Sequence, residues 1–372
     1  MRILHTADLH IGKVVNGYSM LEEQAYALDQ IIATIKEYAI DVLIIAGDVY
    51  DKRYPSDQAS KLFNDFLSNL LVFKIPVLII AGNHDAGVKL EFGKEIFAYQ
   101  DLHIEGQFNE SLKQVTINDE YGVVNFYLAP FMRPSDLRLY TDDVTSYHEA
   151  LAYVIDQANI DKAERNLFIG HQFFASGSES ISDSEQISVG GIENVGYQIL
   201  SDFDYAALGH LHRPQRLMSD FIRYSGSIVK YSLSEVNDNK SLVLIELKEK
   251  GDITYELLPL KSLREFKHIK GYLADILSMD KTDDYVFVTL LDDDVLDAIS
   301  KLKTIFTNLM TLDFDNKRTQ ANATIDLLTD IEDLSASQLF KEFYALFNNS
   351  EMSESQAKIV EQIMERIDQS AS

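Results

Sequence analysis

Short apolar runs alternate with amphipathic stretches along the first hundred residues of the chain. Three of the runs, in RILHTAD, DVLIIAGD and PVLIIAGN, are uninterrupted and rich in branched side chains, as is typical of strands buried on both faces of a sheet. Between and after them, apolar positions recur at helical spacing in residues 20–38, 56–72 and 88–99. The alternation predicts an α/β domain that begins with βαβ units.

Later segments change this pattern. NLFIGH and YAALGH repeat the buried-strand type, and residues 216–258 have the composition of antiparallel strands separated by turn residues. We therefore expect a first domain over residues 1–262. In residues 263–332 short apolar runs flank a helix-like stretch, which predicts a small α+β domain.

Residues 333–372 are predicted to form two helices. Each begins with the S-x-x-Q spacing of a capping box, Ser335 with Gln338 and Ser353 with Gln356, followed by apolar residues at helical spacing. Such an apolar face either packs within its own chain or binds a partner, and the pattern alone favours neither.

Composition narrows the class of protein. Of 372 residues, 46% are hydrophobic and 25% charged, and the apolar runs are shorter than a membrane span needs. The N-terminus lacks the features of a signal peptide, so export is not expected. Without cysteine the chain has no disulfides, thiolate metal sites or cysteine nucleophiles, which fits a reducing compartment. We expect a soluble, cytoplasmic protein.

Potential metal ligands follow five predicted strands. Four of these sites share one pattern, an apolar run, then glycine, then a polar donor. In an open α/β sheet the residues just beyond the carboxyl ends of the strands face the ligand crevice, and glycine lets the backbone turn sharply or approach a ligand closely. One crevice is therefore expected to collect seven donors: Asp8, His10, Asp48, Asn83, His171, His210 and His212.

The donor types point to a pair of metal ions. Seven donors, four of them imidazoles, are more than one ion needs, whereas two ions sharing a carboxylate would use them. Mixed imidazole, carboxylate and amide donors suit manganese, iron or zinc better than magnesium or calcium, and we expect Mn²⁺. Two such ions neutralise a phosphate and align attack by water, so the set predicts phosphoester hydrolysis. Amide hydrolysis fits less well, because an aminopeptidase would have a site richer in carboxylates.

The close pairs of donors are weak evidence when taken singly. In extended chain, residues i and i+2 point to the same side, so Asp8 with His10 and His210 with His212 would each face one cluster. A lone D-x-H is usually accidental. The metal interpretation gains its weight from five such elements in one chain.

The remaining histidines have other expected roles. His5 lies inside the first predicted strand and is expected in the core, while His103, His148 and His268 lack any ligand-bearing context. His84 directly follows a predicted ligand. An imidazole there would stabilise the transition state or protonate the leaving oxygen.

The motifs DLH, GDVYD, GNHD, GHQ and GHLH together resemble the calcineurin-like metallophosphoesterases, whose motifs surround two metals in an α/β/β/α sandwich. Three longer segments, HQFFASGSESISDSEQISVGGIENV, FDYAALGHLHRPQ and IRYSGSIVKYSLSE, are similar to the SbcD family of nuclease subunits of bacterial SbcC–SbcD complexes. The likeness covers residues 1–260 and, more loosely, the rest. Ile228 stands where many relatives have proline, a departure that touches no expected ligand.

The resemblance implies roles for the motif residues. It assigns the seven donors to two metals, with Asp48 bridging them, and makes His84 the catalytic histidine at the scissile phosphate. Asp51 lies where some relatives carry a histidine near the site, and would contact the metal ligands rather than the metals. Arg133, in PFMRPSD, would either contact phosphate or serve the fold.

The resemblance also implies a substrate and partners. The substrate would be duplex DNA, trimmed from its ends and opened at hairpins during repair, replication and recombination, with an SbcC-type SMC ATPase as partner. Residues 263–332 would form a capping domain that contacts DNA, and residues 333–372 would dock on the coiled coil of the ATPase. Helices near the start of the chain would form a homodimer within a heterotetramer. The protein would associate with the nucleoid when bound to DNA.

The acidic charge of the chain bears on this expectation. A formal charge of −26 argues against a nucleic-acid partner, because phosphate binding draws on basic surfaces. If the partner supplies much of the DNA-binding surface, this chain can stay acidic while its metals provide local positive charge.

Two other functions fit part of the sequence. A phosphatase acting on a non-DNA phosphoester would keep all five motifs but leave the SbcD-like middle segment and the C-terminal residues unexplained. An inactive scaffold for DNA ends should have lost ligands, whereas all seven donors and His84 are present.

Overall fold

The computed structural model divides the chain into two compact units, Met1–Glu265 and Phe266–Ser372. It describes residues 1–315 apart from 139, 142, 176–180, 182, 184–192 and 294, and beyond them only residues 340, 344, 352, 353, 356 and 360. Most of the predicted terminal helices therefore lie outside the described residues. Of their capping boxes, the one at Ser353 is described: Ser353 N donates to Gln356 Oε1 at 3.0 Å and Gln356 N to Ser353 Oγ at 3.4 Å.

Two six-stranded sheets form the centre of the first unit. The first sheet has the order β16-β15-β1-β4-β5-β6, in which β1, β4, β5 and β6 are parallel. Its strands are β1 (Arg2–Thr6), β4 (Val42–Ala46), β5 (Val77–Ile80), β6 (Leu102–Glu105), β15 (Ser241–Leu247) and β16 (Ile253–Pro259).

The second sheet has the order β13-β14-β12-β9-β8-β7, with parallel strands from β14 to β8 and an antiparallel strand at each edge. Its strands are β7 (Lys113–Asp119), β8 (Gly122–Ala129), β9 (Arg165–His171), β12 (Tyr205–Gly209), β13 (Gln215–Leu217) and β14 (Ser219–Tyr224). Residues 216–258, predicted as antiparallel strands, thus contribute to both sheets, and β14 runs parallel to β12.

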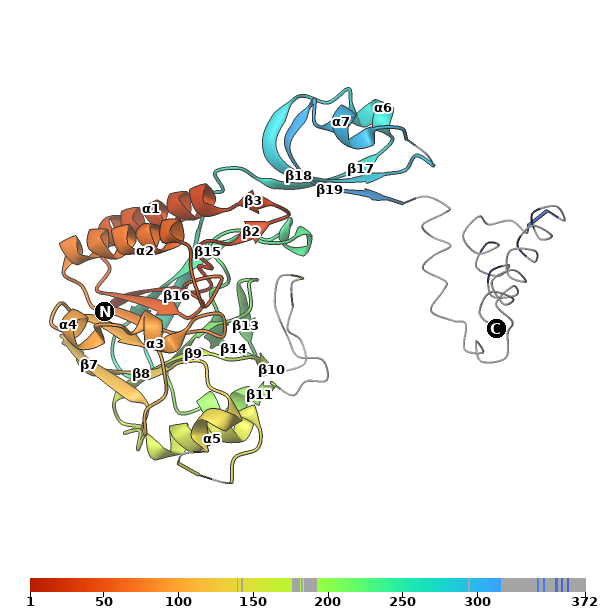
Figure 1. The fold of residues 1–372 in the computed structure, drawn as a ribbon. Coiled ribbons are helices and arrows are strands. Elements are labelled where there is room, and N and C mark those ends of the chain that lie inside the picture. The colour runs from red at the N-terminus through yellow and green to blue at the C-terminus, as the bar shows by residue number, and fades with distance from the viewer. Residues whose placement is uncertain are drawn as a thin grey trace. The chain divides into compact units, whose positions relative to one another are not determined.

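Helices cover the outer face of each sheet, which completes the expected α/β/β/α sandwich (Figure 1). Helices α1 (Leu21–Tyr38) and α2 (Asp57–Leu70) lie over the first sheet, and α5 (Tyr147–Gln157) over the second. Alternate residues of a strand face opposite sides. In β4, Leu43 therefore packs under the helices, while Ile44 lies in the apolar layer between the sheets.

The shorter elements lie in the connections. The predicted helix at 88–99 is instead two helices, α3 (Gly87–Leu90) and α4 (Lys94–Ala98), separated at Gly93, whose φ is 79°. The remaining short strands and 3-10 turns are β2 (Val14–Val15), β3 (Tyr18–Ser19), η1 (Leu71–Phe73), η2 (Pro134–Leu137), β10 (Phe174–Ala175), β11 (Val195–Gly196), η3 (Tyr197–Leu200) and η4 (Leu233–Glu235).

The described part of the second unit is a small sheet with its own core. Its parallel strands β17 (Phe266–Gly271), β18 (Thr282–Leu290) and β19 (Phe306–Phe314) are connected through α6 (Leu273–Ile276) and α7 (Ala298–Leu302). Their buried residues form one apolar cluster. Among the helices of the described residues, none has the length and apolar character needed to cross a membrane.

Candidate metal centre

The carboxyl ends of parallel strands from both sheets meet at one cluster of polar side chains. The first sheet contributes the residues after β1, β4 and β5, and the second contributes the end of β9 and the residues after β12. The cluster contains all seven predicted donors: Asp8, His10, Asp48, Asn83, His171, His210 and His212.

Ligand atoms in the cluster lie close together. Asp48 Oδ2 is 3.5 Å from His10 Nε2 and 3.3 Å from His171 Nε2, and His10 Nε2 is 3.0 Å from His212 Nε2. Within the described residues, three overlapping groups have all their ligand atoms within 4.8 Å of one another: Asp8, His10 and His212; His10, Asp48 and His84; and Asp8, Asp48 and His171. Groups that share a carboxylate are the arrangement that two neighbouring ions require.

Asn83 joins the ligands of the second sheet to those of the first. Its Oδ1 lies 3.2 Å from His171 Nε2 and 3.2 Å from His210 Nδ1. His171 Nδ1 donates to the carbonyl oxygen of Ala46 at 2.8 Å. In the neutral form of this imidazole, the Nε2 lone pair is therefore directed into the cluster.

Turn geometry, not extended chain, aims the paired donors. Asp8, His10 and His210 have φ values of 53°, 43° and 106°, so the expected extended conformation is wrong. Such left-handed conformations cost on the order of 1–3 kcal/mol each and persist only where neighbouring structure enforces them. Here Asp8 N donates to Gly47 O at 3.1 Å and His10 N to Asp48 O at 2.9 Å, which ties the two loops together.

Two motif glycines make room for donor side chains. A Cβ on Gly82 would lie 2.1 Å from Asp48 Oδ1, and a Cβ on Gly47, whose φ is 90°, would lie 2.2 Å from His171 Nδ1. Both distances are far inside van der Waals contact. The strand-glycine-donor pattern therefore reflects packing between neighbouring strand ends as well as tight turns.

Burial and mutual attraction decide the charges in the cluster. Burial opposes the charge on Asp48, but the neighbouring imidazoles, His171 foremost, hold its pKa well below the usual range. Burial likewise opposes charge on His171, yet the Asp48 carboxylate raises the pKa of that imidazole to about 9. Desolvation holds the pKa of His10 well below its usual value and lowers that of His210 to about 3. At neutral pH the cation-free cluster thus holds an ion pair among neutral imidazoles.

The cluster fits divalent metal ions. Among the residues that the structure describes, His10 Nδ1 and His210 Nε2 are buried without a hydrogen-bond partner, although buried polar atoms ordinarily have one. Two imidazole nitrogens also face each other at 3.0 Å, in His10 and His212. Carboxylate, imidazole and amide donors without sulfur suit divalent first-row ions.

His84 lies beside the cluster and is tied to two aspartates. Its backbone N donates to Asp48 Oδ1 at 2.9 Å, and its Nδ1 donates to the carbonyl oxygen of Asp51 at 2.8 Å. The His84 ring meets that of His10 edge-on, with 4.8 Å between centroids. The Asp51 carboxylate accepts a hydrogen bond from Lys13 at 2.9 Å and lies 3.8 Å from His10 Nδ1. Asp51 thus fixes the His84 ring through its backbone carbonyl, and its carboxylate lies beside the His10 ring.

A cleft of about 440 Å³ opens beside Asn83. The exposed residues Arg53 and Arg133 contribute to its lining, and the Arg133 guanidinium lies 5.5 Å from the centre of the Phe131 ring. The lining also contains Asp85 and Asp136, so the cleft presents two exposed arginines beside two carboxylates.

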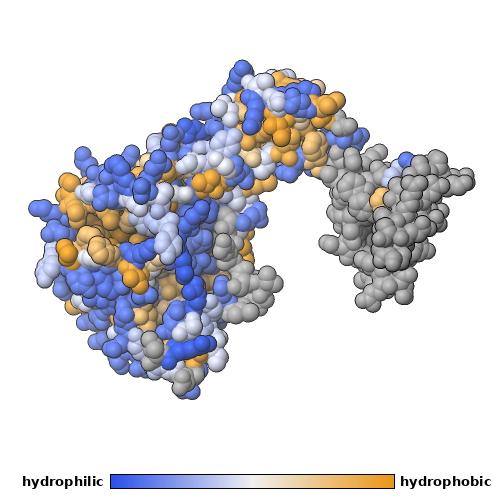
Figure 2. Space-filling model, in the orientation of Figure 1, coloured by the Kyte–Doolittle hydropathy of each residue, from blue (hydrophilic) through white to orange (hydrophobic). Residues whose placement is uncertain are grey.

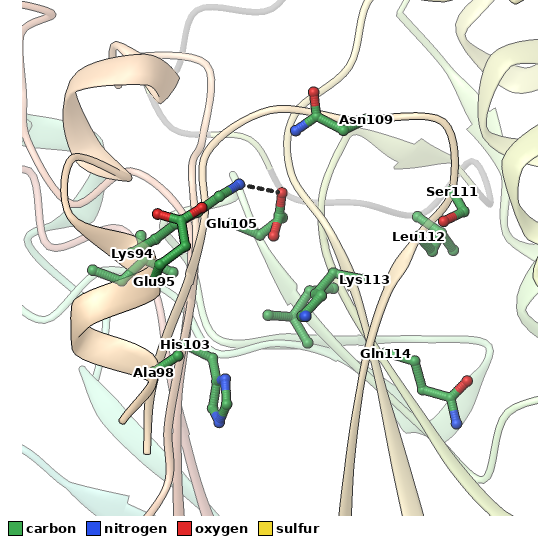
Figure 3. A pocket seen from close by; sticks show the side chains of 12 residues that line it. Lys94, Glu95, Ala98, His103, Glu105, Asn109, Ser111, Leu112, Lys113 and Gln114 are labelled. Carbon is green, nitrogen blue, oxygen red and sulfur yellow. Dashed lines mark hydrogen bonds and ion pairs between the residues drawn. The ribbon is translucent and has the colours of Figure 1, made fainter. Parts of the chain in front are cut away.

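A second cavity, of about 460 Å³, lies between the edge strands β6 and β7 (Figure 3). Lys94 reaches into it and donates to Glu105 at 3.2 Å. None of the seven predicted donors lines it.

Sequence reasoning assigned no role to Asp85, although this residue ends the motif GNHD. The buried carboxylate accepts hydrogen bonds from the backbone N–H groups of Val49, Tyr50 and Gly82 at 3.1, 2.9 and 2.9 Å. It therefore holds the loop after β4 against the loop after β5. Burial, together with the charge of Asp48, raises the pKa of Asp85 to about 6.

Two further residues at the cluster come from the segment IRYSGSIVKYSLSE. Tyr231 donates to the carbonyl oxygen of Leu9 at 2.6 Å, and its ring packs edge-on against His10 and His212. Glu235 Oε1 lies 3.4 Å from His212 Nδ1. Sequence spacing gives no signal for either residue, because both come from the connection between β14 and β15, far along the chain.

Comparison with known proteins agrees with this fold. The family model described as calcineurin-like phosphoesterase matches residues 1–214, and one described as type 5 capsule protein repressor C-terminal domain matches residues 262–347. The first match gives the class of the protein, a phosphoester hydrolase. The SbcD subunit of the nuclease SbcCD from Staphylococcus saprophyticus is 34% identical over 379 residues, covering 98% of each chain. The chain therefore belongs to the SbcD family of nuclease subunits.

Similarity to solved structures is more remote. A dimetal phosphatase from Danio rerio is 11% identical with a TM-score of 0.41, covering 69% of this chain and 95% of that one. The phosphoesterase Yfce from E. coli is 12% identical with a TM-score of 0.28, covering 69% of this chain and 100% of that one.

Proposed function

We propose that the chain is a metal-dependent DNA nuclease that works with an SbcC-type SMC ATPase, trimming double-stranded ends and opening hairpins. The observation that carries the proposal is the overlap of three ligand groups at Asp8, His10 and Asp48. Support for the substrate and partner comes from a nuclease subunit that is 34% identical along almost the whole chain.

The metal ligands in this proposal are the seven donors of the cluster. Asp48 would be shared between two ions, since it takes part in two of the ligand groups and lies within 3.5 Å of imidazoles from both sheets. The mixed oxygen and nitrogen donors favour Mn²⁺. When bound, the ions supply positive charge that activates water and neutralises the phosphodiester.

The surrounding residues orient the substrate and handle protons. His84 is the catalytic histidine, because its Nδ1 is fixed on Asp51 O and its ring lies against the cluster. Arg133 and Arg53 bind phosphates of the DNA in the cleft beside Asn83. Asp51 and Asp85 hold His84 and the two ligand loops in place.

Self-association of the first unit belongs to the same proposal. The homodimer uses exposed apolar side chains on η1, α3, α4 and the loops beside them: Val72, Val88, Phe92, Ile96 and Tyr99, with exposed fractions between 62% and 86%. Figure 2 shows apolar surface in the region of α2 and α4. An apolar patch of this kind commonly marks a protein interface.

The C-terminal parts are assigned by the same reasoning. Residues 263–332 are the capping domain, which contacts DNA, and residues 333–372 bind the ATPase. The protein works in the cytoplasm, associated with the nucleoid when it holds DNA.

The test uses the full chain with Mn²⁺, with and without the matching ATPase. Substrates are a labelled duplex, a hairpin and a generic phosphomonoester. His84→Gln should lower DNA cleavage about 100-fold or more, as loss of a general acid does, without loss of Mn²⁺ binding. The control His103→Gln changes a histidine outside the cluster and should cut normally. Strong monoesterase activity with intact DNA would instead indicate a phosphatase, and no activity on any substrate a scaffold.

A further inference from the structure

A buried carboxylate, from Glu235, and a buried ammonium group, from Lys240, contact His212. Glu235, at the end of η4, is 0% exposed and Lys240, just before β15, is 5% exposed. Glu235 Oε2 accepts a hydrogen bond from Lys240 Nζ at 2.6 Å. Burying such a pair costs several kcal/mol of desolvation, and apolar residues of similar volume often stabilise a fold as well or better. Its position next to a predicted ligand therefore suggests a role beyond stability.

The pair contacts His212 at two points. Glu235 Oε1 lies 3.4 Å from the ring Nδ1, and Lys240 Nζ donates to the His212 carbonyl oxygen at 2.8 Å. One residue of the pair thus faces the imidazole and the other holds its backbone. Contacts at both points fix the direction of the His212 ring.

The Glu235 carboxylate is itself fixed from several sides. Oε1 accepts from Ser232 Oγ at 3.0 Å, and Oε2 accepts from Tyr231 N at 3.3 Å in addition to Lys240. Lys240 also donates to Ser227 Oγ at 2.9 Å. The carboxylate therefore has one defined place relative to the His212 ring.

This arrangement determines which nitrogen of His212 faces the cluster. If Nδ1 donates its hydrogen to Glu235, the lone pair is left on Nε2, the atom that lies 3.0 Å from His10 Nε2. Metal-binding histidines generally donate their other ring N–H to a carboxylate or carbonyl oxygen. His171 does so with Ala46 O at 2.8 Å.

We propose that Glu235, held by Lys240, is a positioning residue that sets the tautomer and direction of His212 for cation binding. The inference rests on the proposed function, since it takes His212 as a metal ligand. A purely structural role would change the stability of the metal-free protein and leave its metal affinity unaltered.

The test measures Mn²⁺ binding to the full chain by the electron paramagnetic resonance signal of free Mn²⁺, beside thermal unfolding in EDTA. Glu235→Gln keeps the size of the side chain and removes its charge, and is expected to weaken binding at one of two sites about 10- to 100-fold. The matched control is Asp119→Asn. Asp119 pairs with the buried Arg165 at the opposite end of the second sheet, with 2.5 Å between Oδ1 and Nη2. This change should lower stability and leave Mn²⁺ affinity unaltered.

The outcomes separate the two proposals. Normal Mn²⁺ affinity in Glu235→Gln, or an equal loss in Asp119→Asn, would overturn the positioning role. If the wild-type chain itself binds no Mn²⁺, the proposed function fails instead. Should Glu235→Gln not fold, Lys240→Gln is measured in its place with the same expected loss. If both are unfolded in EDTA in the cold, the pair serves folding and the positioning role is rejected.

Discussion

Metal binding is expected to release about one proton per chain at neutral pH, and His171 is its source. In the cation-free protein, burial disfavours a charged imidazole here, but Asp48 raises the pKa of His171 to about 9. An imidazole must lose its proton before it can bind a metal ion. Burial keeps the pKa values of His10, His210 and His212 below their usual range, so these rings are neutral already and release nothing.

The magnitude follows from the pKa. At pH 7, two units below a pKa of about 9, roughly 99% of His171 is protonated, so about one proton leaves on binding. Near pH 9 the number falls to about half, and between pH 7 and 8.5 the apparent affinity for Mn²⁺ should rise about tenfold per pH unit. The same group stabilises the metal-free fold fully below pH 6.5, and that stabilisation, about 3 kcal/mol, is lost as pH rises through about 9.

Isothermal titration calorimetry in buffers of different ionisation enthalpy counts the released protons directly. His103→Gln, outside the cluster, should release as many protons as the wild type. Urea unfolding in EDTA at several pH values gives the loss of stability. Mn²⁺ binding without proton release at pH 7, together with an affinity independent of pH, would refute the assignment of a charged His171.

Three further predictions concern positions around the cluster. Gly82→Ala would place a Cβ 2.1 Å from the Asp48 carboxylate, so the Mn²⁺ affinity measured by titration should fall at least about tenfold. The control Gly271→Ala, whose added Cβ would have its nearest neighbour at 3.7 Å, should bind Mn²⁺ normally. Arg133→Gln removes one exposed positive charge from the cleft beside Asn83 and should weaken DNA binding several-fold, or about 1 kcal/mol, in a salt-dependent way, with Mn²⁺ affinity unchanged. Ile96→Lys, at a side chain 72% exposed, should give monomers in light scattering, whereas Leu296→Lys, 87% exposed in the second unit, should remain dimeric.

The sequence predicts well which polar side chains come together, because their position follows from strand topology. A buried parallel strand delivers the residue after it to the same edge as its neighbours, so Asp48 and His210 could be placed at this edge without coordinates. The left-handed backbone that aims His10 could not be, because it depends on hydrogen bonds between separate loops. The same holds for Tyr231, whose hydroxyl bonds to Leu9 across 222 residues of chain.

The sequence also could not predict which of the two sheets each later strand joins. An alternating pattern identifies an antiparallel strand but carries no information about which sheet receives it. The pattern in residues 216–258 therefore predicts β14, β15 and β16 but neither the short strand β13 nor their division between two sheets. The division matters for the site, because the chain crosses from β14 in the second sheet to β15 in the first and passes the cluster on the way. The connection between those strands carries Tyr231 and Glu235.

The acidic charge of the chain and a phosphate-bearing substrate can be reconciled at the cluster itself. In the metal-free centre the Asp48 carboxylate and the protonated His171 offset each other, so this pair offers no net positive charge to a phosphate. Divalent ions bound there would replace the His171 proton and add positive charge. Acidic groups farther away than about 10 Å are screened at ordinary salt, so this local positive charge would act on a phosphate despite the −26 on the chain. Contact between DNA and the cluster should therefore depend on metal before any bond is cut.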